Sequence, residues 1–136
     1  MPGVVTIMVV EDHPATLAAI TKVLQKALPA CALLATGSAE RALHLCATAV
    51  PHLVIMDIAL PGISGIEATR RIKALSPDTH VVMHSGYDVR VYRDASAAAG
   101  ASAFVLKGKV LSELLPVVCS LLPPAAATRN RDFPTA

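Results

Sequence analysis

Tryptophan is absent from the 136-residue sequence, which also contains only two phenylalanines and two tyrosines. A folded core must therefore be built from aliphatic side chains. The sequence has no run of about 18 apolar residues, the length typical of a transmembrane helix. Residues 1–10 lack the positively charged stretch that opens a signal peptide, so we expect a cytoplasmic protein with no membrane contact.

The patterns of charge and cysteine exclude further classes of protein. Formal net charge is +2 with both signs scattered along the chain, so we expect no direct contact with nucleic acid. The three cysteines include no C-x-x-C pair, which argues against a zinc site or a dithiol redox motif. We interpret Cys31, Cys46 and Cys119 as buried small hydrophobic residues.

Five short aliphatic runs alternate with stretches of helical character, and the length suits one compact domain. The runs cover residues 4–10, 32–35, 53–56, 80–84 and 103–106. This alternation predicts an α/β fold with a parallel sheet, covered by helices on both faces.

Helix-start signals occupy the stretches between these runs: Pro14, Ser38 before a helix at 39–49, a capping box of Ser64 and Glu67, and Asp88. We expect the Asp88 helix to end at Gly100 and a fifth helix to cover 110–122. Pro116 lies inside that last pattern, which predicts a kink or a late helix start.

Polar residues follow the ends of four predicted strands. Glu11 and Asp12 follow the first run, Asp57 the third, Ser85 the fourth and Lys107 the fifth. The carboxyl ends of parallel strands meet at one edge of the sheet, where ligands bind, so these side chains should converge on one crevice. Singly each has a simpler interpretation: Asp12 as a helix cap, Ser85 as a turn residue and Lys107 as a solvated charge.

Three carboxylates in one crevice require a cation. The repulsion between two like unit charges about 4 Å apart is about 4 kcal/mol at an effective dielectric constant of about 20. Lys107 supplies one positive charge, and an all-oxygen ligand set favours a hard divalent ion such as Mg²⁺. A carboxylate nucleophile, a metal, a lysine and a hydroxyl together indicate phosphoryl chemistry.

Over residues 4–122 the chain resembles the receiver domain of bacterial two-component response regulators. Three motifs are similar to those of the family: V-V-E-D-H-P at 9–14, M-D-I-A-L-P-G at 56–62 with Gly65, and V-L-K at 105–107. The His-Pro pair resembles the NarL/FixJ branch. The resemblance implies a flavodoxin-like, doubly wound five-stranded sheet in the order 2-1-3-4-5.

The resemblance also implies roles for the crevice residues. Asp57 is the expected phosphoacceptor, and Asp12, Asp57 and the backbone carbonyl of Ala59 are the expected direct Mg²⁺ ligands. Glu11 would act through metal-bound water. Lys107 would neutralise phosphoryl oxygens.

Two further positions correspond to the family's conformational switch. Ser85 takes the place of the switch hydroxyl, and Phe104 that of the switch aromatic, although Phe104 also fits a plain core residue of the fifth strand. Ala59 and Tyr87 follow Asp57 and Ser85 by two positions each, and neither can orient an attacking water through a carboxylate or amide. This predicts slow self-dephosphorylation. Gly108 follows Lys107 where proline is frequent in the family, so a cis bond is not assumed.

Three alternatives remain at this point. A haloacid-dehalogenase-like phosphatase would place a second aspartate at Ala59, which argues against an enzyme. A degenerate receiver that only binds a protein partner would be expected to lose an acid or the lysine. A flavodoxin-like cofactor binder would need a phosphate loop after the first strand, and the sequence has none there.

The expected partner is a sensor histidine kinase or a phosphotransfer protein, docking near the first helix and the strand-end loops. A homodimer through the fourth helix, fifth strand and fifth helix is a further expectation. We predict a receiver domain at 1–122. Residues 123–136 are either a Pro/Ala-rich tail or a truncated linker; in the second case a DNA-binding output domain would be the missing piece.

Overall fold

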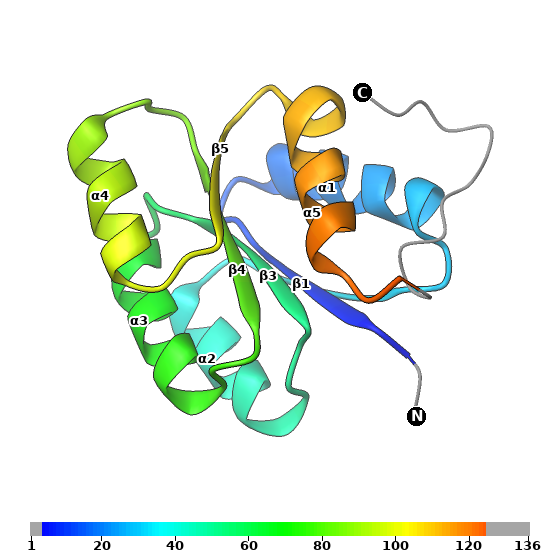
Figure 1. Cartoon of the computed structure of the whole chain (residues 1–136), viewed down its shortest axis with the longest axis horizontal. Helices are drawn as coiled ribbons and strands as arrows, with labels where there is room; N and C mark the ends of the chain where they lie inside the picture. The colour runs from blue at the N-terminus through cyan, green and yellow to red at the C-terminus, as the bar shows by residue number, and fades with distance from the viewer. Residues whose placement is uncertain (1–3, 125–136) are drawn as a thin grey trace.

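The computed structural model describes residues 4–124, so most of the predicted tail lies outside the described residues. Five strands form one parallel sheet in the order β2-β1-β3-β4-β5, which confirms the predicted fold (Figure 1). The strands are β1 (Thr6–Val10), β2 (Ala32–Thr36), β3 (Leu53–Asp57), β4 (His80–Ser85) and β5 (Ala103–Leu106). Each closely matches the aliphatic run that predicted it.

Helices cover both faces of the sheet. They are α1 (Pro14–Ala27), α2 (Ala39–Thr48), α3 (Gly65–Leu75), α4 (Arg90–Ala98), η1 (Val110–Leu114) and α5 (Leu115–Leu121). Figure 1 shows α1 and α5 on one side of the strands and α2, α3 and α4 on the other. None of the helices in this part of the chain is long and apolar enough to cross a membrane.

The core consists of two aliphatic layers, one on each face of the sheet. Alternate residues of β1 point to opposite layers: Ile7 packs toward α1 and α5, and Met8 toward α2 and α3. The largest fully buried side chains are all isoleucine, leucine or methionine. Each such side chain stabilises the fold by about 1.5–3 kcal/mol, so aromatic residues are not needed.

The cysteine prediction holds only in part. Cys46 lies on the buried face of α2, as expected. Cys31 and Cys119 are half-buried and pack against the edge of the core on the α1 and α5 face. Cys31 is less buried because it directly precedes the edge strand β2, which has a neighbouring strand on one side only.

Two of the predicted helix caps are present. Ser38 accepts a hydrogen bond from the amide of Arg41, and Ser64 accepts one from the amide of Glu67. The capping box is only half formed, because the Glu67 carboxylate bonds to Arg71 at 3.1 Å on the next turn of α3. An exposed carboxylate gains as much from a guanidinium four residues later as from the capping amide.

Helix α1 begins as predicted, with Pro14 in its first turn, whereas α4 does not begin as predicted. The N-cap of α1 is His13, whose Nδ1 accepts from the amide of Thr16, so Asp12 does not cap this helix. The prediction that Asp88 caps α4 is wrong. Val89 occupies the N-cap position without a side-chain cap, because the Asp88 carboxylate instead binds Arg93 at 2.6 Å.

Pro116 produces the expected late helix start. A π-helical turn, η1, precedes α5, and Pro116 falls in the first turn of α5. Proline is tolerated there because the amides of the first turn have no intrahelical partner. Gly108, before this turn, has φ +91°, and no cis peptide bond occurs among the described residues.

A glycine at the start of α3 fixes how closely that helix approaches β3. A Cβ at Gly65 would clash with the backbone carbonyl of Asp57, whereas a Cβ at Gly86 would meet nothing within 4 Å. We expect Gly65→Ala to lower the free energy of unfolding by roughly 2 kcal/mol or more, since the backbone must shift. Gly86→Ala, the control, should change it by less than about 0.5 kcal/mol in urea unfolding. Similar losses in both variants would contradict this account.

Candidate functional site

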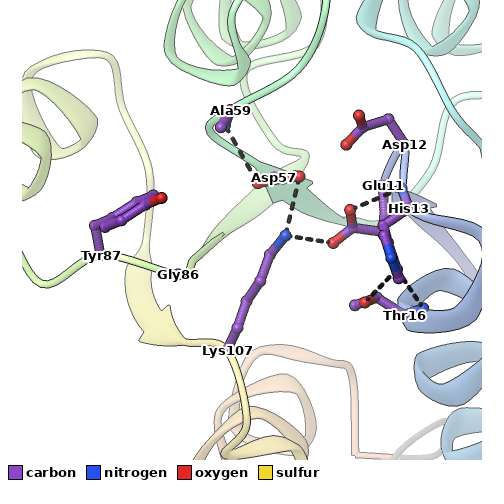
Figure 2. A pocket seen from close by; sticks show the side chains of 9 residues that line it. All are labelled: Glu11, Asp12, His13, Thr16, Asp57, Ala59, Gly86, Tyr87 and Lys107. Atoms are coloured by element: carbon purple, nitrogen blue, oxygen red, sulfur yellow. Dashed lines mark hydrogen bonds and ion pairs between the residues drawn. The ribbon is translucent and has the colours of Figure 1, made fainter.

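The carboxyl ends of β1, β3 and β5 open into a cavity of about 500 Å³. Strand register brings its polar residues together: Val10 of β1 pairs with Met56 of β3, so the next residues, Glu11 and Asp57, lie side by side. Lys107 follows the end of β5. Figure 2 shows the acids and Lys107 pointing toward one another from three separate strand ends. The predicted convergence of Glu11, Asp12, Asp57 and Lys107 is therefore present.

Lys107 links the two buried acids. Its Nζ lies 2.7 Å from Glu11 Oε1 and 3.1 Å from Asp57 Oδ2 (Figure 2). The side chain of Lys107 is 28% exposed, whereas those of Glu11 and Asp57 are 1% and 4% exposed. Backbone amides hold the other oxygens: Ala59 donates to Asp57 Oδ1 and His13 to Glu11 Oε2. Both carboxylates are thus fixed in place.

The charges of this cluster do not balance. Burial, together with the neighbouring Glu11 carboxylate, raises the pKa of Asp57 to about 6 in spite of Lys107. Burial would also raise the pKa of Glu11, but Lys107 and the His13 amide outweigh it and lower that pKa. One ammonium faces two buried carboxylates, and Asp12 adds a third acid. The site therefore favours an additional cation.

The donor set fits a divalent metal ion. Glu11, Asp12 and Asp57 each offer a carboxylate oxygen, and these oxygens all lie within 4.8 Å of one another. The contact between Glu11 Oε1 and Lys107 is an ion pair without hydrogen-bond geometry, so this buried oxygen has no aligned donor among the described residues. An all-oxygen set beside an open cavity suits Mg²⁺, which binds through one or two carboxylates and keeps its waters.

Ser85 lies next to this cluster, since its carbonyl accepts from the Lys107 amide at 2.7 Å, but its hydroxyl bonds elsewhere. It is buried at the end of β4, and its Oγ donates to the carbonyl of Tyr87 and accepts from the Tyr87 amide, both at 3.1 Å. The hydroxyl thus closes the turn that leads from β4 toward α4. In this conformation the serine acts as a turn residue, the simpler of its two interpretations.

Comparison with known proteins places this geometry in a family. The family model described as "Response regulator receiver domain" matches residues 7–118. The chain belongs to this family. Among curated relatives, the transcriptional activator protein ExaE of Pseudomonas putida is 35% identical over 117 residues, which cover 85% of this chain and 54% of ExaE. The response regulator UvrY of Escherichia coli is 26% identical, over 86% of this chain and 54% of UvrY.

These relatives are response regulators of the NarL/FixJ type, and this receiver domain spans about half of their length. Solved structures agree with the fold. A LuxR-family response regulator from Aurantimonas sp. SI85-9A1 is 28% identical with a TM-score of 0.79, covering 96% of this chain and 93% of that one. TrrA of Thermotoga maritima, in complex with Mg²⁺-BeF, is 30% identical with a TM-score of 0.78, covering 87% and 99%.

Several residues around the receiver site escaped the sequence analysis. His13 and Thr16 line the cavity from the start of α1. His84 is a buried member of β4 that pairs with Asp57. Burial, and secondarily the charge of Lys107, lowers the pKa of His84 to about 4. Its place in the aliphatic run 80–84 was a signal for burial, because a strand inside a parallel sheet is covered on both faces.

Phe104 lies away from the receiver's acidic cluster. Its half-buried side chain packs against the core layer under α2 and α3. The guanidinium of Arg93 covers the ring, a contact that no sequence pattern indicated. Tyr87 lines the acidic cavity and is 64% exposed.

The raised pKa of Asp57 predicts a pH-dependent stability. Protonation of Asp57 stabilises the folded state fully below about pH 4, and this contribution is lost as pH rises through about 6. Asp57→Asn removes the buried charge, so we expect it to raise the free energy of unfolding by about 1–2 kcal/mol near pH 8. At about pH 4.5, where most of this contribution is still present, the gain should be only about a third of its size near pH 8. Urea unfolding without divalent metal measures both values.

The control is Asp78→Asn, at an exposed position between α3 and β4. It should change the free energy of unfolding by less than about 0.5 kcal/mol at either pH. An Asp57→Asn gain of the same size at both pH values would contradict the assigned burial cost.

Proposed function

We propose that this receiver domain accepts a phosphoryl group on Asp57 and acts as a phosphorylation-dependent signalling switch. The observation that carries the proposal is the buried Asp57 carboxylate, bonded to Lys107 beside Glu11 at the mouth of an open cavity. The Mg²⁺-BeF complex named for TrrA supports it, because that protein shares the fold at 30% identity.

The phosphoryl donor would be the phosphohistidine of a sensor histidine kinase or phosphotransfer protein. An oxygen of Asp57 attacks phosphorus, the new O–P bond forms, and the N–P bond of the donor breaks. The departing imidazole nitrogen keeps the bonding pair and takes up a proton from water. Backbone contacts hold Asp57 ready for this step, since the Ala59 amide already fixes Oδ1. Lys107 offsets negative charge on the phosphoryl oxygens.

Mg²⁺ is the proposed cofactor. Asp12, Asp57 and the backbone carbonyl of Ala59 would hold it directly, and Glu11 through water. When bound, the ion supplies the positive charge that the cluster lacks and draws phosphoryl oxygens toward Asp57. Asp12 is exposed and lines the cavity, so its carboxylate is accessible to an incoming ion.

Ser85 and Phe104 are the proposed switch residues. To hold a phosphoryl oxygen, the Ser85 hydroxyl must give up its two bonds to Tyr87. That exchange rearranges the loop between β4 and α4, and Phe104 on the neighbouring strand β5 would follow. The output would be read on the face formed by α4, β5 and α5, which could also form a homodimer.

The domain limits are proposals as well. We place the receiver at residues 1–122 and treat residues 123–136 as a tail or linker. A transcriptional role is named for ExaE, a protein about twice the length of the matched region. For this chain, the corresponding output would require residues outside the receiver domain.

Labelling with a small phosphodonor tests the acceptor. Incubation with acetyl phosphate and Mg²⁺ should add one phosphoryl mass to the protein, measured by intact mass spectrometry. Asp57→Ala should remain unlabelled because the nucleophile is gone, whereas Asp78→Ala should be labelled normally. Chelation of the metal should abolish labelling of the unaltered protein. Equal labelling of Asp57→Ala and the unaltered protein would show that the acceptor is another residue.

The lifetime of the phosphorylated state is a second test. Ala59 and Tyr87 both line the cavity and offer no carboxylate or amide side chain to orient water. Introducing Ala59→Asn and Tyr87→Glu together should shorten the phosphoryl half-life on Asp57 by about tenfold or more. Val91→Glu adds the same charge at an exposed site on α4 and should leave the half-life unchanged. A half-life unaltered in the double variant would remove the hypothesis of slow self-dephosphorylation.

A further inference from the structure

Arg93 joins the loop before α4 to strand β5. Its Nε lies 2.6 Å from Asp88 Oδ1 in that loop, and its guanidinium carbon lies 4.5 Å from the centre of the Phe104 ring. The ion pair lowers the pKa of Asp88, mainly through the hydrogen bond from Arg93. The Arg93 side chain thus connects the loop before α4 to strand β5, the two segments that would move together in the proposed switch.

The loop end of this bridge is continuous with Ser85. The Ser85 hydroxyl bonds to both backbone groups of Tyr87, and Asp88 is the next residue. If Ser85 turns toward Asp57, Tyr87 loses these bonds and the backbone that carries Asp88 changes conformation. The carboxylate that holds Arg93 over Phe104 then moves away from its present position.

Helix α4 is otherwise weakly fixed to the protein. Its N-cap makes no side-chain hydrogen bond, and Ser96 is its only buried residue. Beneath the helix lies a cavity of about 200 Å³ with Arg93, Ser96 and Phe104 in its wall. The buried Oγ of Ser96 has no hydrogen-bond partner in the described part of the chain. The cavity and the unpaired Ser96 hydroxyl both indicate that packing between α4 and β5 is incomplete in this conformation.

We propose that Asp88 and Arg93 form a clamp that holds Phe104 in its present position, and that opening this clamp carries the movement of Ser85 to β5. This inference rests on the proposed function. Arg93 is a positioning residue here: it touches neither the phosphoryl site nor the metal ligands. The clamp favours the unphosphorylated conformation, so removing it should make the phosphorylated conformation easier to reach.

The clamp must be weak for a reversible switch. Arg93 and Asp88 have side chains that are 44% and 55% exposed, so both the ion pair and the cation–π contact are screened by water. Loss of such a clamp shifts a two-state equilibrium by about three- to tenfold. The same factor should appear in the affinity for a phosphoryl analogue that binds the switched conformation.

The test measures affinity for beryllofluoride with Mg²⁺ by isothermal titration calorimetry. Arg93→Met and Asp88→Asn should each bind about three- to tenfold more tightly than the unaltered protein. The matched control is Arg90→Met, on the same helix, which removes an exposed arginine paired with Asp94. Its affinity should be unchanged. In a Phe104→Leu background, Arg93→Met should no longer increase affinity, because the ring that the clamp holds is missing.

Fluorine NMR provides a measurement that would not change in this way if Arg93 only stabilised the fold. The sequence contains only two phenylalanines, so fluorinated phenylalanine gives two signals, and Phe104→Leu assigns the signal of Phe104. Without ligand, Arg93→Met should shift the Phe104 signal toward the position seen with beryllofluoride. Arg90→Met should leave it in place.

The outcomes separate the two proposals. Beryllofluoride binding that is equal in Arg93→Met and Arg90→Met would overturn the clamp and leave the phosphoacceptor intact. An affinity gain from Arg93→Met that persists in the Phe104→Leu background would also overturn it. If the unaltered protein neither binds beryllofluoride nor is labelled by acetyl phosphate, the proposed function itself fails, and the clamp with it.

Discussion

The contact of one lysine with two buried carboxylates is the constraint on which this structure depends. Lys107 from the end of β5 reaches Glu11 after β1 and Asp57 at the end of β3. Buried carboxylates are costly without a partner, so the three strand ends must keep their register for the charges to remain close. The remaining excess of negative charge is what suits the crevice to a cation.

The sequence was sufficient for the sheet and for the acids around Lys107. Buried parallel strands are continuous aliphatic runs, and the topology of such sheets places the residues after them at one edge. The helix boundaries depended on local competition and were less predictable. Asp88 was expected to cap α4, but a guanidinium within reach competed for the same carboxylate. Pro116 was expected to cause a kink or a late helix start, and the second is observed, because the effect of proline is confined to its own backbone.

Side-chain direction within the switch region could not be predicted. Ser85 stands at the expected strand end, yet its hydroxyl closes a turn with Tyr87, because a serine bonds equally well to its own loop and to a ligand. The position of Arg93 over Phe104 joins residues from different elements, and no periodicity encodes such a contact. The sequence thus identified the residues of the acidic cluster, but not the contacts that connect this cluster to the rest of the domain.

The helices differ in how firmly they are attached to the sheet. On one face, α1 and α5 insert Ile20, Leu24, Leu115 and Val118 into a continuous layer of buried residues. On the other, α2 and α3 each bury at least three residues, whereas α4 buries only Ser96 and packs the half-buried Tyr92 against the core. The weakest attachment therefore lies at the α4 edge of the molecule. In the proposed switch, a protein bound to α1 would meet a surface that stays the same on phosphorylation, while a protein bound to α4 would meet one that changes.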